Sequence, residues 1–201
     1  MDPHRGEAKM GMDYFFLARA TDPQHAKAVL NCLDFQSGAV FSAMVVKGGD
    51  PYALAVALEA IKFTGRTRLI IMSDQENAVK NLVDMIRDSR THETAVINTP
   101  KGSSASAGGI ERANYEVEKQ IRTLRSRFEE NYGESVGLDH KMLPFLVRHC
   151  AWLITHYQVK SDMRDFVDDR TKDRWQSLLK LYTSGTPGKL QTCPSWTTDG
   201  T

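Results

Sequence analysis

The pattern of apolar positions predicts alternating strands and helices, and its clearest feature is one short buried strand. Residues 68–74 (RLIIMSD) form a nearly unbroken apolar run that ends at the carboxylate of Asp74. Such a run is typical of a strand buried on both faces, and the spacing of Ala78, Leu82 and Ile86 after it predicts a helix. Ligands of open α/β sheets bind beyond the carboxyl ends of strands, so Asp74 stands where a functional acid is expected. A helix N-cap is the alternative interpretation of Asp74.

Four other segments have the composition of strands. The first is dense in aromatic and aliphatic residues and contains Asp13. A connecting loop is expected over 19–26, and the glycine-containing link 35–38 is short enough for a hairpin. The expected strands are 11–18, 27–34, 39–46, 68–74 and 92–98.

Helix signals are strongest at residues 50–65. Asp50 is expected to cap a helix that has Pro51 at its first position and is closed by Gly65. Residues 99–109 are rich in glycine, serine and threonine and are predicted to be a mobile loop, after which Glu111 opens the longest helix. The expected helices are 51–63, 75–90, 111–132 and 145–154.

This element order implies an α/β fold with a mixed sheet, in which the first strand can lie beside the fourth. Asp13 and Asp74 would then stand about 5 Å apart on adjacent strands. Two carboxylates this close repel each other unless a cation lies between them, and hard divalent ions such as Mg²⁺ take these ligands. Glu111 is the candidate third acid. The alternatives are Asp34 for the first position and Glu76 or Glu116 for the others.

Composition describes a soluble globular chain. Of 201 residues 41% are hydrophobic and 25% charged, no run is long enough for a membrane span, and residues 1–9 lack the apolar segment of a signal peptide. Three widely spaced cysteines indicate a reducing compartment, with Cys32 and Cys150 expected in the core and Cys193 near the end of the chain. His149 and His156 have the wrong spacing for a zinc pair.

A formal net charge of +1 means that any nucleic-acid site must be local. One candidate is a set of cations at three-residue intervals on the longest predicted helix, for which an ordinary solvated face is the alternative. This cation row consists of Lys119, Arg122 and Arg125.

The three acids and their surroundings resemble the catalytic core of retroviral and retrotransposon integrases. That family has an Asp in its first strand, an Asp closing its fourth and a Glu about three dozen residues later on a helix; here 36 residues separate Asp74 from Glu111. Residues 12–16 (MDYFF), 73–78 (SDQENA) and 106–111 (SAGGIE) are similar to its three motifs, although Ala107 replaces the usual Asn. The resemblance covers about residues 11–160.

The resemblance implies a ribonuclease H-like mixed five-stranded sheet flanked by helices. It implies metal-dependent DNA strand transfer with Mg²⁺ or Mn²⁺ on Asp13, Asp74 and Glu111, the cation row on DNA, and a homo-oligomer, nuclear if the element is eukaryotic and active. A polar leader (1–10) would precede the core (11–160), and a charged, flexible extension with a short helix (161–201) would follow it. An inactive nucleic-acid-binding remnant of a retrotransposon polyprotein and a ribonuclease H-like nuclease are the alternatives.

Overall fold

The computed structural model describes residues 8–19, 22–74, 76–98 and 104–158. The chain divides into two units, residues 1–160 and 161–201. The short helix predicted in the second unit, and Cys193, lie outside the described residues. All of the described strands and helices belong to the first unit.

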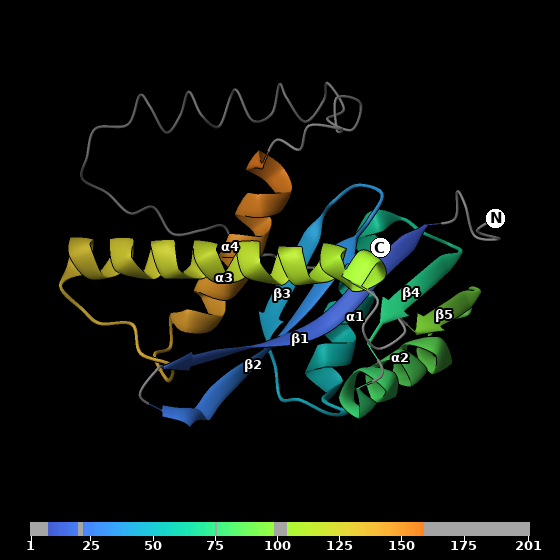
Figure 1. Ribbon diagram of the computed structural model, residues 1–201, viewed down its shortest axis with the longest axis horizontal. Helices are drawn as coiled ribbons and strands as arrows, with labels where there is room; N and C mark the ends of the chain where they lie inside the picture. The colour runs from blue at the N-terminus through green and yellow to red at the C-terminus, as the bar shows by residue number, and fades with distance from the viewer. Residues whose placement is uncertain (1–7, 20–21, 75, 99–103, 159–201) are drawn as a thin grey trace, which may run out of the picture. The chain divides into compact units, whose positions relative to one another are not determined.

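A mixed sheet with the strand order β3-β2-β1-β4-β5 forms the centre of the first unit (Figure 1). β2 pairs antiparallel with both β1 and β3, whereas β4 runs parallel to β1 and to β5. The predicted neighbourhood of the first and fourth strands is therefore confirmed. The strands are β1 (Lys9–Arg19), β2 (Asp22–Asp34), β3 (Val40–Met44), β4 (Leu69–Ser73) and β5 (Thr94–Asn98).

The loop predicted over 19–26 is wrong, because β2 begins at Asp22, which pairs with Arg19 of β1. Pro23 and its polar neighbours suggested a loop. The register between β1 and β2 shifts in this region, and the pairing of β2 with β3 stops at Val29. The first part of β2 therefore pairs with β1 alone. A proline is tolerated in a strand segment that has a partner on one side only.

The helix over 51–63 forms as predicted. In α1 (Pro51–Thr64) the Asp50 side chain accepts from the Tyr52 backbone N–H at 3.0 Å. Gly65 closes the helix at φ 66°, a left-handed conformation that favours glycine. The remaining helices are α2 (Asn77–Ser89), α3 (Ser104–Tyr132) and α4 (Leu143–Tyr157).

α3 starts seven residues before the predicted position, so the loop predicted over 99–109 is helical from Ser104 onward. Residues 99–103 lie outside the described residues. The two glycines at 108 and 109 suggested a loop because glycine weakens helices. At Gly109, however, an added Cβ would collide with the ring of Phe35, so the absence of a side chain lets the helix approach the β2–β3 turn.

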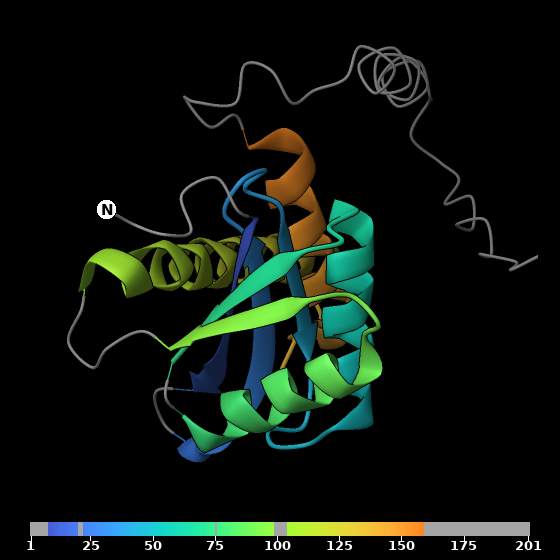
Figure 2. The same ribbon diagram turned by 90° about the vertical axis from the view of Figure 1, so that its right-hand side faces the viewer.

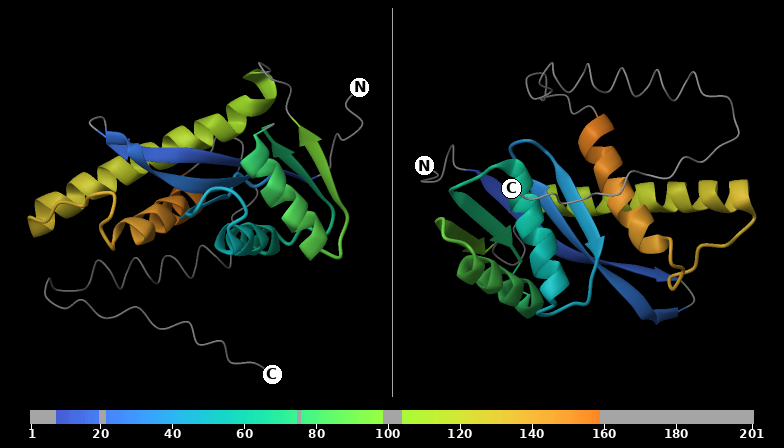
Figure 3. Two further views of the ribbon diagram at one scale, coloured as in Figure 1. Left: turned by 90° about the horizontal axis from the view of Figure 1, so that it is seen from below. Right: turned by 180° about the vertical axis from the view of Figure 1, so that it is seen from behind.

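Two apolar cores pack the helices against the sheet. Met10, Met12 and Tyr14 of β1 face the core shared with α1 and α2. Leu17 belongs to a second core, shared with α3 and α4, and Figures 2 and 3 show α3 on the face opposite α1 and α2. Cys32 lies in the first core and Cys150 in the second, as predicted. None of the helices in the described part of the chain is long and apolar enough to cross a membrane.

Candidate active site

The pairing of β1 with β4 brings Asp13 and Asp74 near each other. Met12 of β1 is the register partner of Ser73 of β4; Asp13 follows Met12 within β1, and Asp74 follows Ser73 just past the end of β4. Parallel neighbours in a sheet are about 4.8 Å apart, and residues at the same level point to the same face. Asp13 is half-buried and Asp74 exposed. The structure thus confirms that the strands leading to these acids are neighbours, and the charge of Asp74 acts on Asp13.

The capping interpretation of Asp74 is wrong, because α2 begins later than predicted. The N-cap position of α2 is Glu76, and the first helical residue is Asn77. The Glu76 side chain makes no capping hydrogen bond. Asp74 thus stands on the link between β4 and α2, at the carboxyl end of its strand.

Hydrogen bonds on both oxygens hold the carboxylate of Asp13. Its Oδ1 accepts from the Tyr14 backbone N–H, and its Oδ2 accepts from Asn114 Nδ2, each at 2.8 Å. Burial raises the pKa of Asp13, these two hydrogen bonds partly offset the rise, and the negative charges of Asp74 and Glu76 add to it. Asp74 and Glu76 are therefore close enough for their charges to act on the Asp13 carboxylate.

Asn114 contacts the candidate site, although the sequence alone did not single it out. It lies on α3 three residues after Glu111, so the two side chains occupy one face of the helix. The three-residue spacing is visible in the sequence. The way α3 packs against the sheet is not visible there, and this packing places the Asn114 amide within hydrogen-bonding distance of Asp13 on β1.

Glu111 is exposed on the early part of α3, one turn before Asn114. No hydrogen bond joins it to Asp13 in the described structure, where the partners of that carboxylate are Tyr14 and Asn114. Within residues 8–19, 22–74, 76–98 and 104–158, no three His, Cys, Asp or Glu side chains are close enough to hold a metal ion. The structure thus brings Asp13 and Asp74 near each other and places Glu111 on the face of α3 that carries Asn114.

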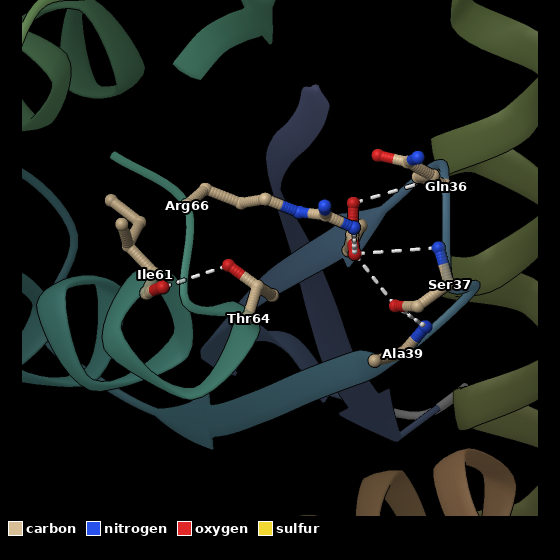
Figure 4. Close-up of polar contacts among 7 residues, drawn as sticks. Gln36, Ser37, Ala39, Ile61, Thr64 and Arg66 are labelled. Carbon is tan, nitrogen blue, oxygen red and sulfur yellow. Dashed lines mark hydrogen bonds and ion pairs between the residues drawn. The ribbon is translucent and has the colours of Figure 1, made fainter. Parts of the chain in front are cut away.

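The rival acid Asp34 has a structural task, as the preferred interpretation expected. Its carboxylate is 1% exposed and accepts from the backbone N–H groups of Gln36 and Ser37 and from the Ser37 hydroxyl, at 3.2, 3.3 and 2.6 Å. Arg66 approaches the same carboxylate at 3.4 Å (Figure 4). These contacts hold the β2–β3 turn together.

Of the other two alternative acids, Glu116 points away from Glu111 and Glu76 lies near Asp13. Glu116 follows Glu111 by five residues, more than a quarter-turn away around α3. Glu76 lies near the site, because its charge acts on Asp13, but it forms an ion pair with Lys47. The Lys47 ammonium also stands 4.8 Å from the ring centroid of Phe16, an exposed residue of β1.

The cation row continues along α3 beyond Asn114. Lys119 and Arg122 are exposed and Arg125 is half-buried. Arg122 forms an ion pair with Glu118 at 2.9 Å, which offsets part of the positive charge. The role of the row stays a prediction.

His149 and His156 do not face each other. Both stack on Trp152 of α4, with ring centroids 5.6 and 4.7 Å from it. Both histidines are exposed.

The carboxylates of Asp13 and Asp74 fit a hard divalent cation. Mg²⁺ is typically held by one or two carboxylates together with substrate phosphate, and Asp13 within β1 and Asp74 just after β4 supply two carboxylates. Among the described residues, each Asp13 oxygen accepts one hydrogen bond, and a carboxylate oxygen can accept a second. Burial is the main cause of the raised Asp13 pKa, and a cation between the acids would offset the smaller contribution from repulsion by Asp74.

Comparisons with known proteins rest on structure alone, since no protein-family model and no curated sequence matches the chain. A chain of the simian T-cell lymphotropic virus intasome, solved with the PP2A regulatory subunit B56 gamma, is 17% identical with a TM-score of 0.58. The match covers 96% of this chain and 60% of that one.

Two structures of the HTLV-2 integrase catalytic core domain in complex with magnesium also match. The dimeric form gives 15% identity and a TM-score of 0.53, covering 76% of this chain and 89% of that one. The trimeric form gives 15% identity and a TM-score of 0.51, and the match covers 84% of this chain and 93% of that one. The fold is that of an integrase catalytic core. This ribonuclease H-like sheet, flanked by helices, was the fold predicted from the sequence.

The extent of the matches differs between the two kinds of structure. The chain spans most of each isolated HTLV-2 integrase core but only 60% of the intasome chain. At 15–17% identity these matches establish the arrangement of strands and helices. The chemistry of the candidate site does not follow from them.

Proposed function

We propose that this chain is an integrase-type polynucleotidyl transferase that carries out metal-dependent DNA strand transfer. The observation that carries the proposal is the closeness of two carboxylates: Asp13 and Asp74 directly follow the last paired residues of β1 and β4, Met12 and Ser73, and the charge of Asp74 acts on Asp13. The HTLV-2 cores that share the fold were solved in complex with magnesium, which supports the use of a divalent ion by this chain.

In this proposal each acid has a distinct position. Asp13, held by Asn114 and the Tyr14 backbone, presents a fixed carboxylate. Asp74 supplies a second carboxylate from the adjoining link, and Glu111 would have to approach the other two acids from α3 to complete the site. Bound divalent ions would supply an activated oxygen nucleophile and stabilise the leaving oxygen at phosphorus.

The cation row is the proposed contact with DNA phosphates. It lies on the helix that carries Glu111 and Asn114, so a duplex bound along α3 would lead to the acids. Such contacts position nucleic acid without reading its sequence. The dimeric and trimeric forms of the HTLV-2 cores support a homo-oligomer as the working state.

A strand-transfer assay with labelled blunt-ended duplex DNA and Mg²⁺ or Mn²⁺ tests the proposal. Asp13→Asn should abolish joined products, because an amide lacks the charge that holds a hard cation. Asp84→Asn is the matched control, since Asp84 is an acid of α2 whose contact is an exposed ion pair with Arg87. Equal product from wild type and Asp13→Asn would contradict the proposal.

Two observations favour a second candidate, a nucleic-acid-binding domain without turnover. The described residues contain no group of three potential ligands close enough for a metal ion, and Ala107 replaces the Asn of the third motif. Salt-dependent DNA binding without joined or cleaved product in either metal would favour this candidate. Cleavage of an RNA–DNA hybrid alone would instead indicate a ribonuclease H-like nuclease.

A further inference from the structure

A chain of polar side chains runs from Asp13 into the interior of the protein. Asn114 Nδ2 donates to Asp13 Oδ2, Asn31 Nδ2 donates to Asn114 Oδ1, and the Ser42 hydroxyl donates to Asn31 Oδ1. All three distances are 2.8 Å. The four residues come from β1, α3, β2 and β3.

The sheet register aligns the members that lie on strands. Asn31 of β2 is the partner of Asp13 on one side and of Ser42 on the other, so the three form one row across adjacent strands. Asn31 is 0% and Ser42 5% exposed. The flanking residues on this face of β2, Val29 and Leu33, belong to the apolar core. Polar residues at such places are costly unless every group is paired.

The Asp13 carboxylate determines the direction of each of these three hydrogen bonds. An ionised carboxylate only accepts, so Asn114 must turn its NH₂ toward Asp13 and its oxygen toward Asn31. Asn31 must then turn its own NH₂ toward Asn114, and its oxygen accepts from Ser42. With the opposite orientation, two acceptors would face each other at Asp13.

We infer that Asn31 and Ser42 are positioning residues, which hold the Asn114 amide with its NH₂ on Asp13 and so fix the carboxylate orientation presented to a metal ion. The metal part of this inference rests on the proposed function, whereas the orientation of the Asn114 amide does not. Groups that orient metal ligands in this way typically contribute about 10–100-fold to metal affinity.

Ser42→Val and Ser42→Thr form a matched pair of variants that differ in shape very little, while only threonine keeps the hydroxyl. The first readout is the side-chain NH₂ signal of Asn114 in ¹⁵N NMR without metal. In Ser42→Thr the signal should stay near its wild-type position, and in Ser42→Val it should shift or broaden because the Asn31 oxygen has lost its donor. An identical Asn114 signal in both folded variants would overturn the inference.

Manganese titration is the second readout. Ser42→Val should bind Mn²⁺ about 10-fold more weakly than Ser42→Thr. In an Asn114→Ala background, the same exchange of threonine for valine should change the affinity little, because Ser42 acts through Asn114. If the threonine-to-valine exchange weakens Mn²⁺ binding equally in the Asn114→Ala background, Ser42 does not act through Asn114 and the inference is overturned. Absence of Mn²⁺ binding by the wild type would contradict the proposed function, while the NMR signal would still decide the orientation of the amide.

Discussion

Replacing Gly109 with alanine should push the start of α3 away from the sheet. A Cβ at this position would lie closer than 3.0 Å to Phe35 Cε1, and two further atoms of the ring would stand at 3.4 Å. The ring has little room on its other side, where a Cβ on Gly11 of β1 would meet Phe35 Cε2 at 3.0 Å. The backbone of Phe35 is anchored by its N–H, which donates to the Lys9 carbonyl at 3.0 Å.

Gly108→Ala is the matched control, because nothing lies within 4 Å of a Cβ at that position. Both glycines are inside α3, so either alanine gains up to about 1 kcal/mol of helix propensity. Only alanine at 109 introduces overpacking, which costs about 1–3 kcal/mol. Phe35 is 37% exposed and its ring can yield partly toward solvent, which places the expected difference near the lower limit, about 1 kcal/mol.

Urea unfolding of the two variants measures this difference directly. The Mn²⁺ affinity should fall in Gly109→Ala and persist in Gly108→Ala, because Glu111 and Asn114 move with the start of α3. Phe35→Leu added to Gly109→Ala should recover part of the lost stability relative to Phe35→Leu alone. Equal stability of the two alanine variants would refute the reasoning that Phe35 sets the position of α3.

Three other predictions address the site, the cation row and the core. Asp74→Asn should remove Mn²⁺ binding in calorimetric titration while leaving the unfolding midpoint nearly unchanged; unaltered affinity would exclude Asp74 as a ligand. Neutralising the cation row to glutamine should make the slope of log affinity against log salt shallower by up to about 3 in fluorescence anisotropy with duplex DNA, and an unchanged slope would reduce the row to a solvated face. Burial raises the pKa of the Cys32 thiol from 9.0 to about 12, so between these pH values the unfolded thiol is ionised while the folded one keeps its proton. Stability should therefore fall by about 1.4 kcal/mol per pH unit across that window, and Cys32→Ala should remove this share of the slope in urea unfolding at stepped pH; an equally steep slope in the variant would contradict it.

Local signals in the sequence were enough to predict much of the fold. The cap Asp50, the following Pro51 and the closing Gly65 each act within a few residues, and α1 has the predicted limits. The apolar run that ends at Asp74 likewise identified β4 and the placement of its acid.

The errors arose where distant parts of the chain determine the structure. Pro23 lies in a strand because its stretch of β2 has a partner on one side only, and Gly109 lies in a helix because Phe35 packs against it. Both residues carry local signals for loops, which tertiary contacts override.

The candidate site was likewise predicted in part. Asp13 and Asp74 follow from strand order, which the sequence indicated. The roles of Asn114, Asn31 and Ser42 depend on how α3 docks and on which polar residue of each strand faces the second core. Neither property is encoded in the spacing of apolar residues along a single element.

Anomalous scattering from a crystal soaked with Mn²⁺ tests the proposed metal site most directly, because it locates the ion without relying on activity. We expect an anomalous peak between the carboxylates of Asp13 and Asp74, at ligand distances of about 2.0–2.2 Å, which is lost in crystals of Asp13→Asn. A peak remote from both carboxylates, or none at a saturating Mn²⁺ concentration, would contradict the assignment of these two acids as metal ligands.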